Sequence, residues 1–230
     1  MPFSLEKKPR IIKDLEKKAK RGDASASYRL FTLWNKNQYT SNYEKVAIKH
    51  LNRAVSDSVD FNFRFNELKL LNYKKFNNLK LETSESNITA IIGNNGAGKT
   101  SVLEAIAKSL SWFVNNILKE GRNGKQITSD EISEFNDPEF SSISTIFSYL
   151  KLQYFSMEIS KPKNAVVNSS QYQGDFDNIR LIADMYRIIN SKVEDFNLPL
   201  VAYYPIERTQ NPSLIQKSKI DNFANKVHWS

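Results

Sequence analysis

The first quarter of the chain has the hydrophobic spacing of α-helices. Between residues 10 and 57, small and apolar side chains recur every three or four positions, and Gly22-Asp23 and residues 37–42 interrupt that period. The positions on the three stripes are Ile11, Leu15 and Ala19, then Ser27, Leu30, Phe31 and Trp34, then Tyr43, Ala47, Leu51, Ala54 and Val55. The pattern predicts three short helices, and the small residues allow their backbones to approach closely.

Between residues 61 and 81 the spacing changes to every second residue, which is typical of strands. The apolar positions are Phe61, Phe63 and Phe65, followed on the opposite parity by Leu68 and Leu70, and then by Leu79 and Leu81. The change of parity predicts a β-bulge near Asn66-Glu67, and the last pair predicts a second, antiparallel strand. We expect the three phenylalanines to belong to the core rather than to a surface that stacks bases.

A short apolar run precedes the most informative segment of the chain. Residues 88–92 (ITAII) are apolar at nearly every position, which is typical of a strand buried on both faces. The segment GNNGAGKT, residues 93–100, follows at once, and the helical period then returns until Gly121. The predicted apolar stripe of this helix is Leu103, Ile106, Leu110, Phe113, Val114 and Ile117.

The remainder of the chain alternates polar segments with apolar ones. Residues 120–142 and 163–175 are polar and predict long loops, the first on the surface or partly disordered. Residues 147–159 have the alternation of one or two strands, and residues 179–196 predict a helix. Residues 200–204 (LVAYY) predict a buried strand that the following proline closes. The order of these elements predicts an α/β fold.

Composition restricts the class of protein. The apolar share is 40%, there is no cysteine, and no apolar stretch approaches the roughly 18 residues of a membrane span. The N-terminus lacks the apolar region of a secretory signal. These features exclude a disulfide framework and predict a cytoplasmic protein with no membrane contact.

Positive charge is concentrated near the N-terminus. The net charge is +8, and the segment 7–21 supplies much of it. Its basic residues are Lys7, Lys8, Arg10, Lys13, Lys17, Lys18, Lys20 and Arg21, against Asp14 and Glu16 within the segment and Glu6 beside it. Such a segment can contact nucleic acid or an acidic partner through counterion release. A solvated helix face is an equally good interpretation.

The segment from Gly93 to Thr100 satisfies GxxxxGK[ST], the P-loop motif. A predicted strand precedes it and a predicted helix follows, as the motif requires. By chance the motif would occur in roughly one chain of this length in a few hundred. The segment therefore predicts a site for a nucleoside triphosphate and Mg²⁺.

The chemistry of phosphate binding explains these residue types. Glycines at 93, 96 and 98 allow backbone N–H groups to point at phosphate oxygens, and the helix adds the positive end of its dipole. Lys99 would place its charge between the β- and γ-phosphates, which makes it the predicted catalytic residue, and the Thr100 hydroxyl would bind Mg²⁺. The predicted nucleotide-binding set is Gly93, Asn94, Asn95, Gly96, Ala97, Gly98, Lys99, Thr100 and Ser101.

The sequence around the P-loop resembles one group of these proteins. LKLLNYKKFNNLKL upstream and GNNGAGKTSVLEAI match the opening of ABC-type ATPases such as the SMC, RecF and OLD proteins. A small-molecule kinase matches less well, and the Asn-Lys-x-Asp reader of guanine-specific GTPases does not occur. The run GDASASYRLFTLW with YEKVAIKHLNRAV resembles one Sel1-like or tetratricopeptide (TPR) helical pair. Joined to such a head, it is similar to the PtuA-type ATPases of retron-linked Septu antiphage systems.

This resemblance implies an ABC/SMC-like head at 59–230 behind a Sel1/TPR-like segment at 1–58. It implies that the chain binds ATP with Mg²⁺, that nucleotide drives dimerisation of two heads, and that the protein acts in antiviral defence. The implied partners are an HNH-type nuclease and a retron reverse transcriptase with its DNA–RNA product. Two other functions stay open: a DNA-repair ATPase of the RecF or OLD kind, and a nucleotide-sensing scaffold without hydrolysis.

Two parts of that family's site do not appear in the sequence, namely the Walker B acidic pair and the S-G-G signature. Asp184 ends a run like that of Walker B, but it lies in a predicted helix and no Glu follows it, so we reject it. Either the chain is part of a longer protein, which we expect, or it binds ATP without efficient hydrolysis.

Three further residues have weaker signals. Gln210 follows the predicted strand at 200–204, where related heads place a glutamine that reaches Mg²⁺ or the attacking water, although an ordinary loop is the simpler interpretation. Lys74 and Lys75 match a position where related heads have a basic residue near the nucleotide. Two solvated lysines in a hairpin turn are the simpler interpretation there.

Overall fold

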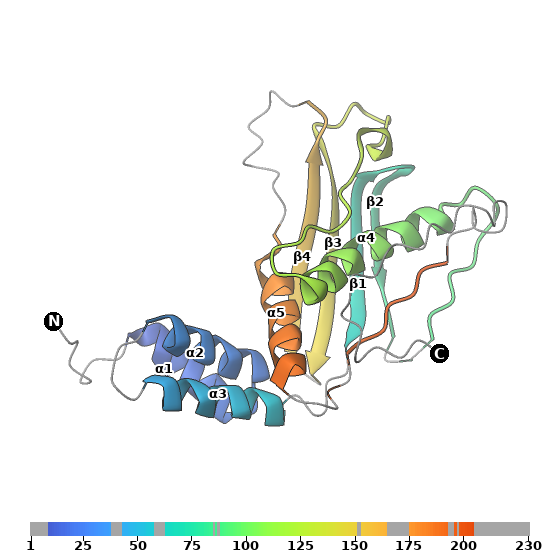
Figure 1. The fold of residues 1–230 in the computed structure, drawn as a ribbon. Coiled ribbons are helices and arrows are strands. Elements are labelled where there is room, and N and C mark those ends of the chain that lie inside the picture. Colours follow the sequence, from blue (N-terminus) through green and yellow to red (C-terminus); the bar gives the residue numbers. More distant parts are fainter. Residues whose placement is uncertain are drawn as a thin grey trace, which may run out of the picture. The chain divides into compact units, whose positions relative to one another are not determined.

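The computed structural model describes residues 9–37, 43–57, 63–84, 86, 88–150, 153–164, 175–192, 196 and 198–204. These residues form five α-helices and one four-stranded antiparallel sheet (Figure 1). The chain divides into two units, Met1–Pro199 and Leu200–Ser230, and all of these elements belong to the first. Helices together with a sheet confirm the α/β prediction. Among the described helices, none combines the length and the apolar character needed to cross a membrane.

The three predicted N-terminal helices are present as α1 (Arg10–Lys20), α2 (Ala24–Asn37) and α3 (Tyr43–Asp57). Helix α2 begins after Asp23, whose carboxylate accepts hydrogen bonds from the Ser25 hydroxyl at 2.8 Å and the Ala26 N–H at 2.9 Å. A small separate core joins α1 to α2 and consists of Leu15, Ala19, Ala26 and Leu30. The predicted stripe was wrong at Ile11, which lies exposed in the first turn of α1, outside the small core.

These helices also pack on the rest of the chain. Ala24, Tyr28 and Ala54 are buried in the main hydrophobic core. The Tyr28 hydroxyl donates a hydrogen bond to the carboxylate of Asp184, which lies in a C-terminal helix of the first unit. The helical segment therefore contributes to the same core as the sheet.

The sheet has the strand order β2-β1-β3-β4, with β1 (Arg64–Tyr73), β2 (Phe76–Glu82), β3 (Phe140–Leu150) and β4 (Gln153–Pro162). The pairing of β1 with β3 shifts register between Phe65 and Glu67, which confirms the predicted bulge. Because the bulge inserts one residue, the phenylalanines before it and the leucines after it can face the same core.

Two helices, α4 (Lys99–Leu118) and α5 (Asp177–Lys192), lie side by side across one face of the sheet (Figure 1). Aromatic rings fill the space between the layers. The ring centroids of Phe63 and Phe113 are 4.4 Å apart, and those of Phe113 and Tyr186 are 5.5 Å apart. This packing confirms Phe63 and Phe65 as core residues, whereas Phe61 lies outside the described residues.

The predicted stripe of α4 is confirmed at Phe113, which is buried, and at Ile106, Leu110 and Ile117, which pack partly buried against the main core, but it was wrong at Leu103. Leu103 is exposed, and the buried residues are Val102, Ala105, Ser109, Trp112, Phe113 and Asn116. The reason lies in the segment after α4, which folds back along the helix and brings backbone carbonyls with it. The Trp112 indole N–H donates to the carbonyl of Lys125 at 3.1 Å, and the Asn116 amide donates to that of Arg122 at 2.8 Å. Polar side chains on this face of α4 therefore satisfy backbone carbonyls that would otherwise lack a hydrogen-bond donor.

The same contacts correct the prediction of a surface loop at 120–142. A short 3₁₀ helix, η1 (Ser129–Glu131), lies within it, and Ile127, Glu131 and Ile132 are buried. Strand β3 begins at Phe140, earlier than the alternation predicted. The second predicted loop, 163–175, falls largely outside the described residues.

Two predicted buried strands were wrong. Residues 88–92 form no strand, and Ile88 and Ile92 are 82% and 93% exposed. Leu200 and Tyr204 are also exposed, and residues 200–204 have no strand geometry. A strand requires a neighbour for its backbone hydrogen bonds, and within the described part of the chain neither segment pairs with one.

Candidate nucleotide-binding site

Residues 93–98 form an open, glycine-rich loop that leads directly into α4. Gly96 and Gly98 have φ angles of 75° and 95°, in the left-handed region that glycine enters most easily. The loop is closed by a hydrogen bond from the Ala97 N–H to the Asn94 carbonyl at 3.1 Å. Gly98 is the N-cap of α4, so the loop ends where the helix dipole is positive.

The backbone donors at this helix end suit an anion. The N–H groups of Lys99, Thr100 and Ser101 find no acceptor among the described residues, as expected for the first turn of a helix. The loop before them is exposed from residue 93 to residue 97. Free N–H groups, a positive dipole end and access from solvent are what a phosphate group requires.

Lys99 holds its charge over the loop. Its ammonium donates to the carbonyls of Gly93 at 2.7 Å and Asn94 at 2.8 Å. Through these bonds the side chain extends from the start of α4 to the first two residues of the loop. The predicted catalytic lysine therefore lies beside the same backbone that would surround a phosphate.

The turn between β1 and β2 lies against this loop. The Lys75 ammonium donates to the Gly96 carbonyl, and Phe76 approaches Gly98 so closely that a Cβ there would lie 2.4 Å from the ring. Gly98 is thus required for its backbone angle and for the space it leaves.

The two lysines of the turn, Lys74 and Lys75, are not simply solvated side chains, because both have partners in the protein. Lys74 is not a solvated side chain, because its ammonium pairs with Glu104 of α4 and, at 3.6 Å, with Glu131 of η1. Partial burial alone would lower the pKa of Lys74, but the carboxylates of Glu104 and Glu131 outweigh it and raise the pKa above its usual value. Lys75 is exposed but contacts the P-loop.

For Mg²⁺, the predicted site supplies one protein ligand. The Thr100 hydroxyl is exposed at the second residue of α4 and would be the protein ligand of a Mg²⁺ ion. When bound, Mg²⁺ neutralises phosphate charge. No cluster of three or more acidic or histidine side chains that could hold a metal ion occurs among the described residues. Asp184 lies within α5 and accepts hydrogen bonds from Tyr28 and Arg187, so its carboxylate connects helices rather than facing the P-loop.

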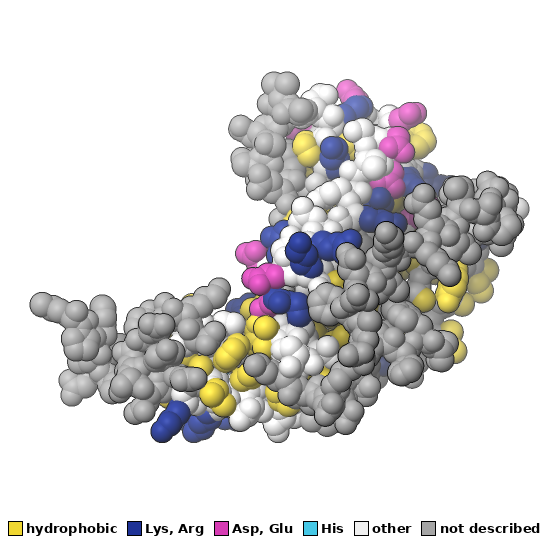
Figure 2. Space-filling view, in the orientation of Figure 1, with side chains coloured by type: hydrophobic (Ala, Val, Ile, Leu, Met, Phe, Trp, Pro, Cys, Tyr) yellow, Lys and Arg dark blue, Asp and Glu magenta, His cyan; other side chains and the backbone are white. Residues whose placement is uncertain are grey.

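A surface hollow of about 590 Å³ lies away from the P-loop, between α2, α4 and α5. Figure 2 shows basic and acidic side chains close together over this part of the molecule. Arg187 pairs there with Asp184 and, at 3.2 Å, with Glu120. Because opposite charges meet across it, the hollow has no uniform charge for a ligand, and we interpret it as a junction between helices.

The remaining predicted residues separate into two groups. Gln210 lies outside the described residues, as do Lys7 and Lys8. The basic residues of α1 are mostly exposed, which both interpretations of the basic segment require.

Sequence reasoning missed the buried carboxylate of Glu131. The signal that could have found it is the capping box T-S-D-E, in which Thr128 and Glu131 bond reciprocally at the start of η1.

The loop, the lysine that follows it and the N–H groups in the first turn of α4, which have no acceptor among the described residues, define a P-loop nucleotide-binding protein. The family of AAA domains (AAA_23) matches residues 67–228, which is well over half of the chain. The chain belongs to this family.

Two curated relatives are named as probable ATPases. The chain is 29% identical over 206 residues to the retron Vc95 probable ATPase of Vibrio cholerae serotype O1 biovar El Tor, covering 87% of this chain and 39% of that protein. It is 26% identical over 208 residues to the retron Ec83 probable ATPase of Escherichia coli, covering 89% and 37%. The DNA replication and repair protein RecF of Rickettsia akari (strain Hartford) is 32% identical over 103 residues, covering 45% and 26%. The chain thus spans less than two fifths of the length of these retron relatives.

Solved structures offer only distant likenesses. A RecF–ATP structure from the RecFOR pathway has a TM-score of 0.32 and 22% identity, over 44% of this chain and 25% of that one. A structure from work on ATP-driven dimerisation and DNA-stimulated activation of SMC ATPases has a TM-score of 0.36 and 17% identity, over 64% of this chain and 95% of that one. Both TM-scores are below 0.5.

Proposed function

We propose that this chain binds ATP and Mg²⁺ through residues 93–101 and is part of a retron-associated ATPase. The observation that carries the proposal is the P-loop itself, in which free backbone N–H groups and the Lys99 ammonium meet at the start of α4. Lys99 would neutralise phosphate charge, and Thr100 would hold the metal ion. The two retron relatives, which match along most of the chain, support the association with retrons.

The finer proposal concerns antiviral defence. In it, ATP binding brings two heads together and so controls a partner nuclease of the HNH type, with the retron reverse transcriptase and its DNA–RNA product as regulators. Hydrolysis requires acidic residues that hold Mg²⁺ and polarise water, and the proposal assigns these to parts of the ATPase other than the P-loop half of the site. The basic residues 7–21 are proposed to contact nucleic acid, and Gln210 to contact the metal ion or the water.

The test is a Lys99→Ala variant, studied for ATP binding and for protection of cells from phage. Loss of the ammonium should weaken ATP binding strongly and abolish protection. Lys119→Ala is the matched control, because Lys119 is an exposed lysine just beyond the other end of α4 and should leave both properties unchanged. Full protection by the Lys99 variant would refute the defence role of ATP binding.

A second candidate function is DNA repair by an ATPase that acts directly on DNA. The match to RecF, at 32% identity over 103 residues, favours it. It predicts ATP hydrolysis that DNA stimulates without any partner protein. Hydrolysis that stays at its basal rate with DNA, and rises only with the nuclease or the reverse transcriptase present, would favour the first function instead.

A further inference from the structure

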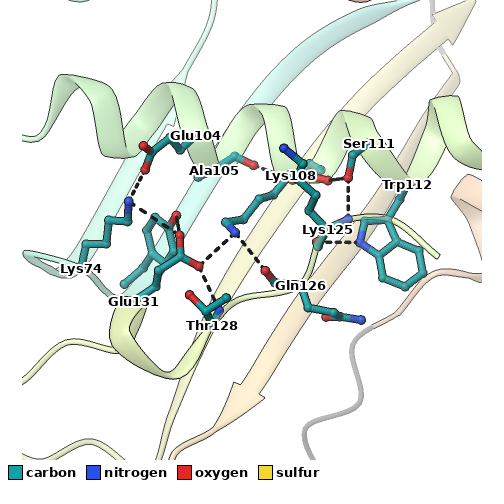
Figure 3. A network of polar contacts seen from close by, with 12 residues as sticks. Lys74, Glu104, Ala105, Lys108, Ser111, Trp112, Lys125, Gln126, Thr128 and Glu131 are labelled. Carbon is teal, nitrogen blue, oxygen red and sulfur yellow. Dashed lines mark hydrogen bonds and ion pairs between the residues drawn. The ribbon is translucent and has the colours of Figure 1, made fainter. Parts of the chain in front are cut away.

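A network of charges connects α4, η1 and the β1–β2 turn and is centred on the buried carboxylate of Glu131 (Figure 3). Glu131 is only 8% exposed, and a buried charge is costly unless it is paired and hydrogen-bonded. Its partners satisfy both oxygens. The Tyr73 hydroxyl donates to Oε1 at 3.1 Å, the Thr128 N–H donates to Oε2 at 2.9 Å, and the Lys108 ammonium lies 3.0 Å from Oε2.

The ionised state of Glu131 is the favoured one. Burial alone would raise the pKa of this carboxyl, but the hydrogen bond from Thr128 and the Lys108 ammonium outweigh it and hold the pKa below its usual value. Glu131 therefore carries a fixed negative charge between two lysines, Lys74 and Lys108.

These two lysines come from different elements. Lys108 is on α4 and lies one turn after Glu104, which itself pairs with Lys74. Lys74 belongs to the turn between β1 and β2. Figure 3 shows the acidic and basic side chains alternating from this turn to α4 and η1. The network thus connects the turn to the helix that begins at the P-loop.

Glu131 also holds the backbone of that turn. The N–H of Lys74 donates to the Glu131 carbonyl at 2.7 Å, and the N–H of Ser133 donates to the Asn72 carbonyl at 2.8 Å. Asn72 and Lys74 both have a φ angle of 51°, a conformation that costs a non-glycine residue free energy and persists only where neighbours hold it. The segment around Glu131 supplies these neighbours.

The turn held in this way touches the P-loop. Lys75 bonds to the Gly96 carbonyl, and Lys75 and Phe76 surround Gly98. A shift of the turn would therefore move the wall against which two of the phosphate-binding glycines lie.

We propose that Glu131 is a positioning residue for the nucleotide site: it fixes the β1–β2 turn to α4 and so keeps the P-loop in the shape that binds phosphate. This inference rests on the proposed ATP binding. Among the described residues, the contacts of the Glu131 side chain are to groups outside the P-loop, and it acts through Lys74 and Lys108. In metal sites, residues that orient a ligand from behind typically cost about 10-fold or more in affinity when they are lost, and we expect a similar effect here.

The test is ATP affinity in a Glu131→Gln variant, which keeps the shape of the side chain and removes its charge. Binding of a fluorescent ATP analogue should weaken about 10-fold, and hydrogen exchange should speed up at residues 72–76 and 93–98. Glu134→Gln is the matched control, because Glu134 is an exposed acid three residues away and the same charge is removed. It should change neither measurement.

The outcomes separate this inference from the proposed function. If the wild-type protein does not bind the analogue, the proposed function fails. If the wild type binds and Glu131→Gln binds equally well, even with a lower melting temperature, Glu131 is merely structural and the inference is overturned. An equal loss in the Glu134 variant would also overturn it, because the effect would be one of general charge. Should Glu131→Gln fail to fold, Lys108→Met removes the same link from the other side and must weaken binding as well.

Discussion

The sheet and the P-loop arm, defined as residues 88–98, both contain runs of apolar residues. Their apolar side chains differ in how far they are exposed to solvent. In β3, Ile143 and Phe147 are fully buried between neighbouring strands and helices. In the arm, Ile88 and Ile92 are almost fully exposed, although Ile91 packs partly buried against the core, and the first turn of α4 that follows has backbone N–H groups with no acceptor among the described residues. The difference shows that apolar sequence leads to burial only where a strand has neighbours. It also separates the part that stabilises the chain from the part that is available to bind a ligand.

The largest expected effect on stability is in the sheet. The Phe147 ring lies 5.2 Å from that of Phe63 and 5.4 Å from that of Phe155, and it is fully buried. Phe147→Ala should lower the free energy of unfolding by about 3–5 kcal/mol, measured by urea denaturation, because it removes apolar contacts and leaves a cavity. Tyr154→Ala, at an exposed position of the next strand, should cost less than about 0.5 kcal/mol. Equal costs at the two positions would contradict the assignment of the core.

Gly98 of the P-loop can be compared with Gly121, which lies beyond the end of α4 and also has a positive φ angle. Gly98 and Gly121 have φ angles of 95° and 70°, but a Cβ at Gly98 would meet Phe76 at 2.4 Å, whereas one at Gly121 would meet nothing within 4 Å. Gly121→Ala should cost about 1 kcal/mol of stability, from its backbone angle alone. Gly98→Ala should cost about 2–3 kcal/mol and weaken ATP binding as well, because the turn must move.

The measurements are denaturant melts and ATP titrations of both variants. If Gly98→Ala binds ATP as tightly as Gly121→Ala does, the turn does not limit the shape of the loop. The comparison isolates the steric contact, since both variants place alanine in a left-handed conformation.

The sequence predicted the helices, the bulge and the P-loop because these depend on local periodicity and local chemistry. The change of parity at Asn66-Glu67, for example, is visible in the chain itself. The burial of Glu131 could not be predicted with the same ease, because its partners Tyr73 and Lys108 come from distant segments. The exposure of Ile92 was missed because periodicity reports the character of a strand and not whether a neighbour pairs with it.

Acid should weaken the link between the two regions. The pKa of Glu131 is lowered in the folded protein, so its contribution to stability is complete above its unfolded value of about 4.5 and is lost as the pH falls through the folded value. Wild-type stability should therefore fall between about pH 5 and pH 3 more steeply than that of Glu131→Gln. Asp130 and Asp137 also have lowered pKa values and remain in both proteins, so they contribute equally to the two curves. Parallel curves would mean that Glu131 has no stabilising charge.

The smallest expected effect on stability is at Ile92, an exposed residue of the arm. Ile92→Ser should change the free energy of unfolding by less than about 0.5 kcal/mol, because a side chain that is 93% exposed loses little apolar contact. Ile143→Ser, the matched change on a fully buried strand, should cost several times more, since it buries a hydroxyl and leaves a cavity. Both values come from urea denaturation of the purified protein. A cost above about 2 kcal/mol at Ile92 would show that this apolar run is covered in solution, and the contrast between the sheet and the arm would then concern only the loop and not the residues before it.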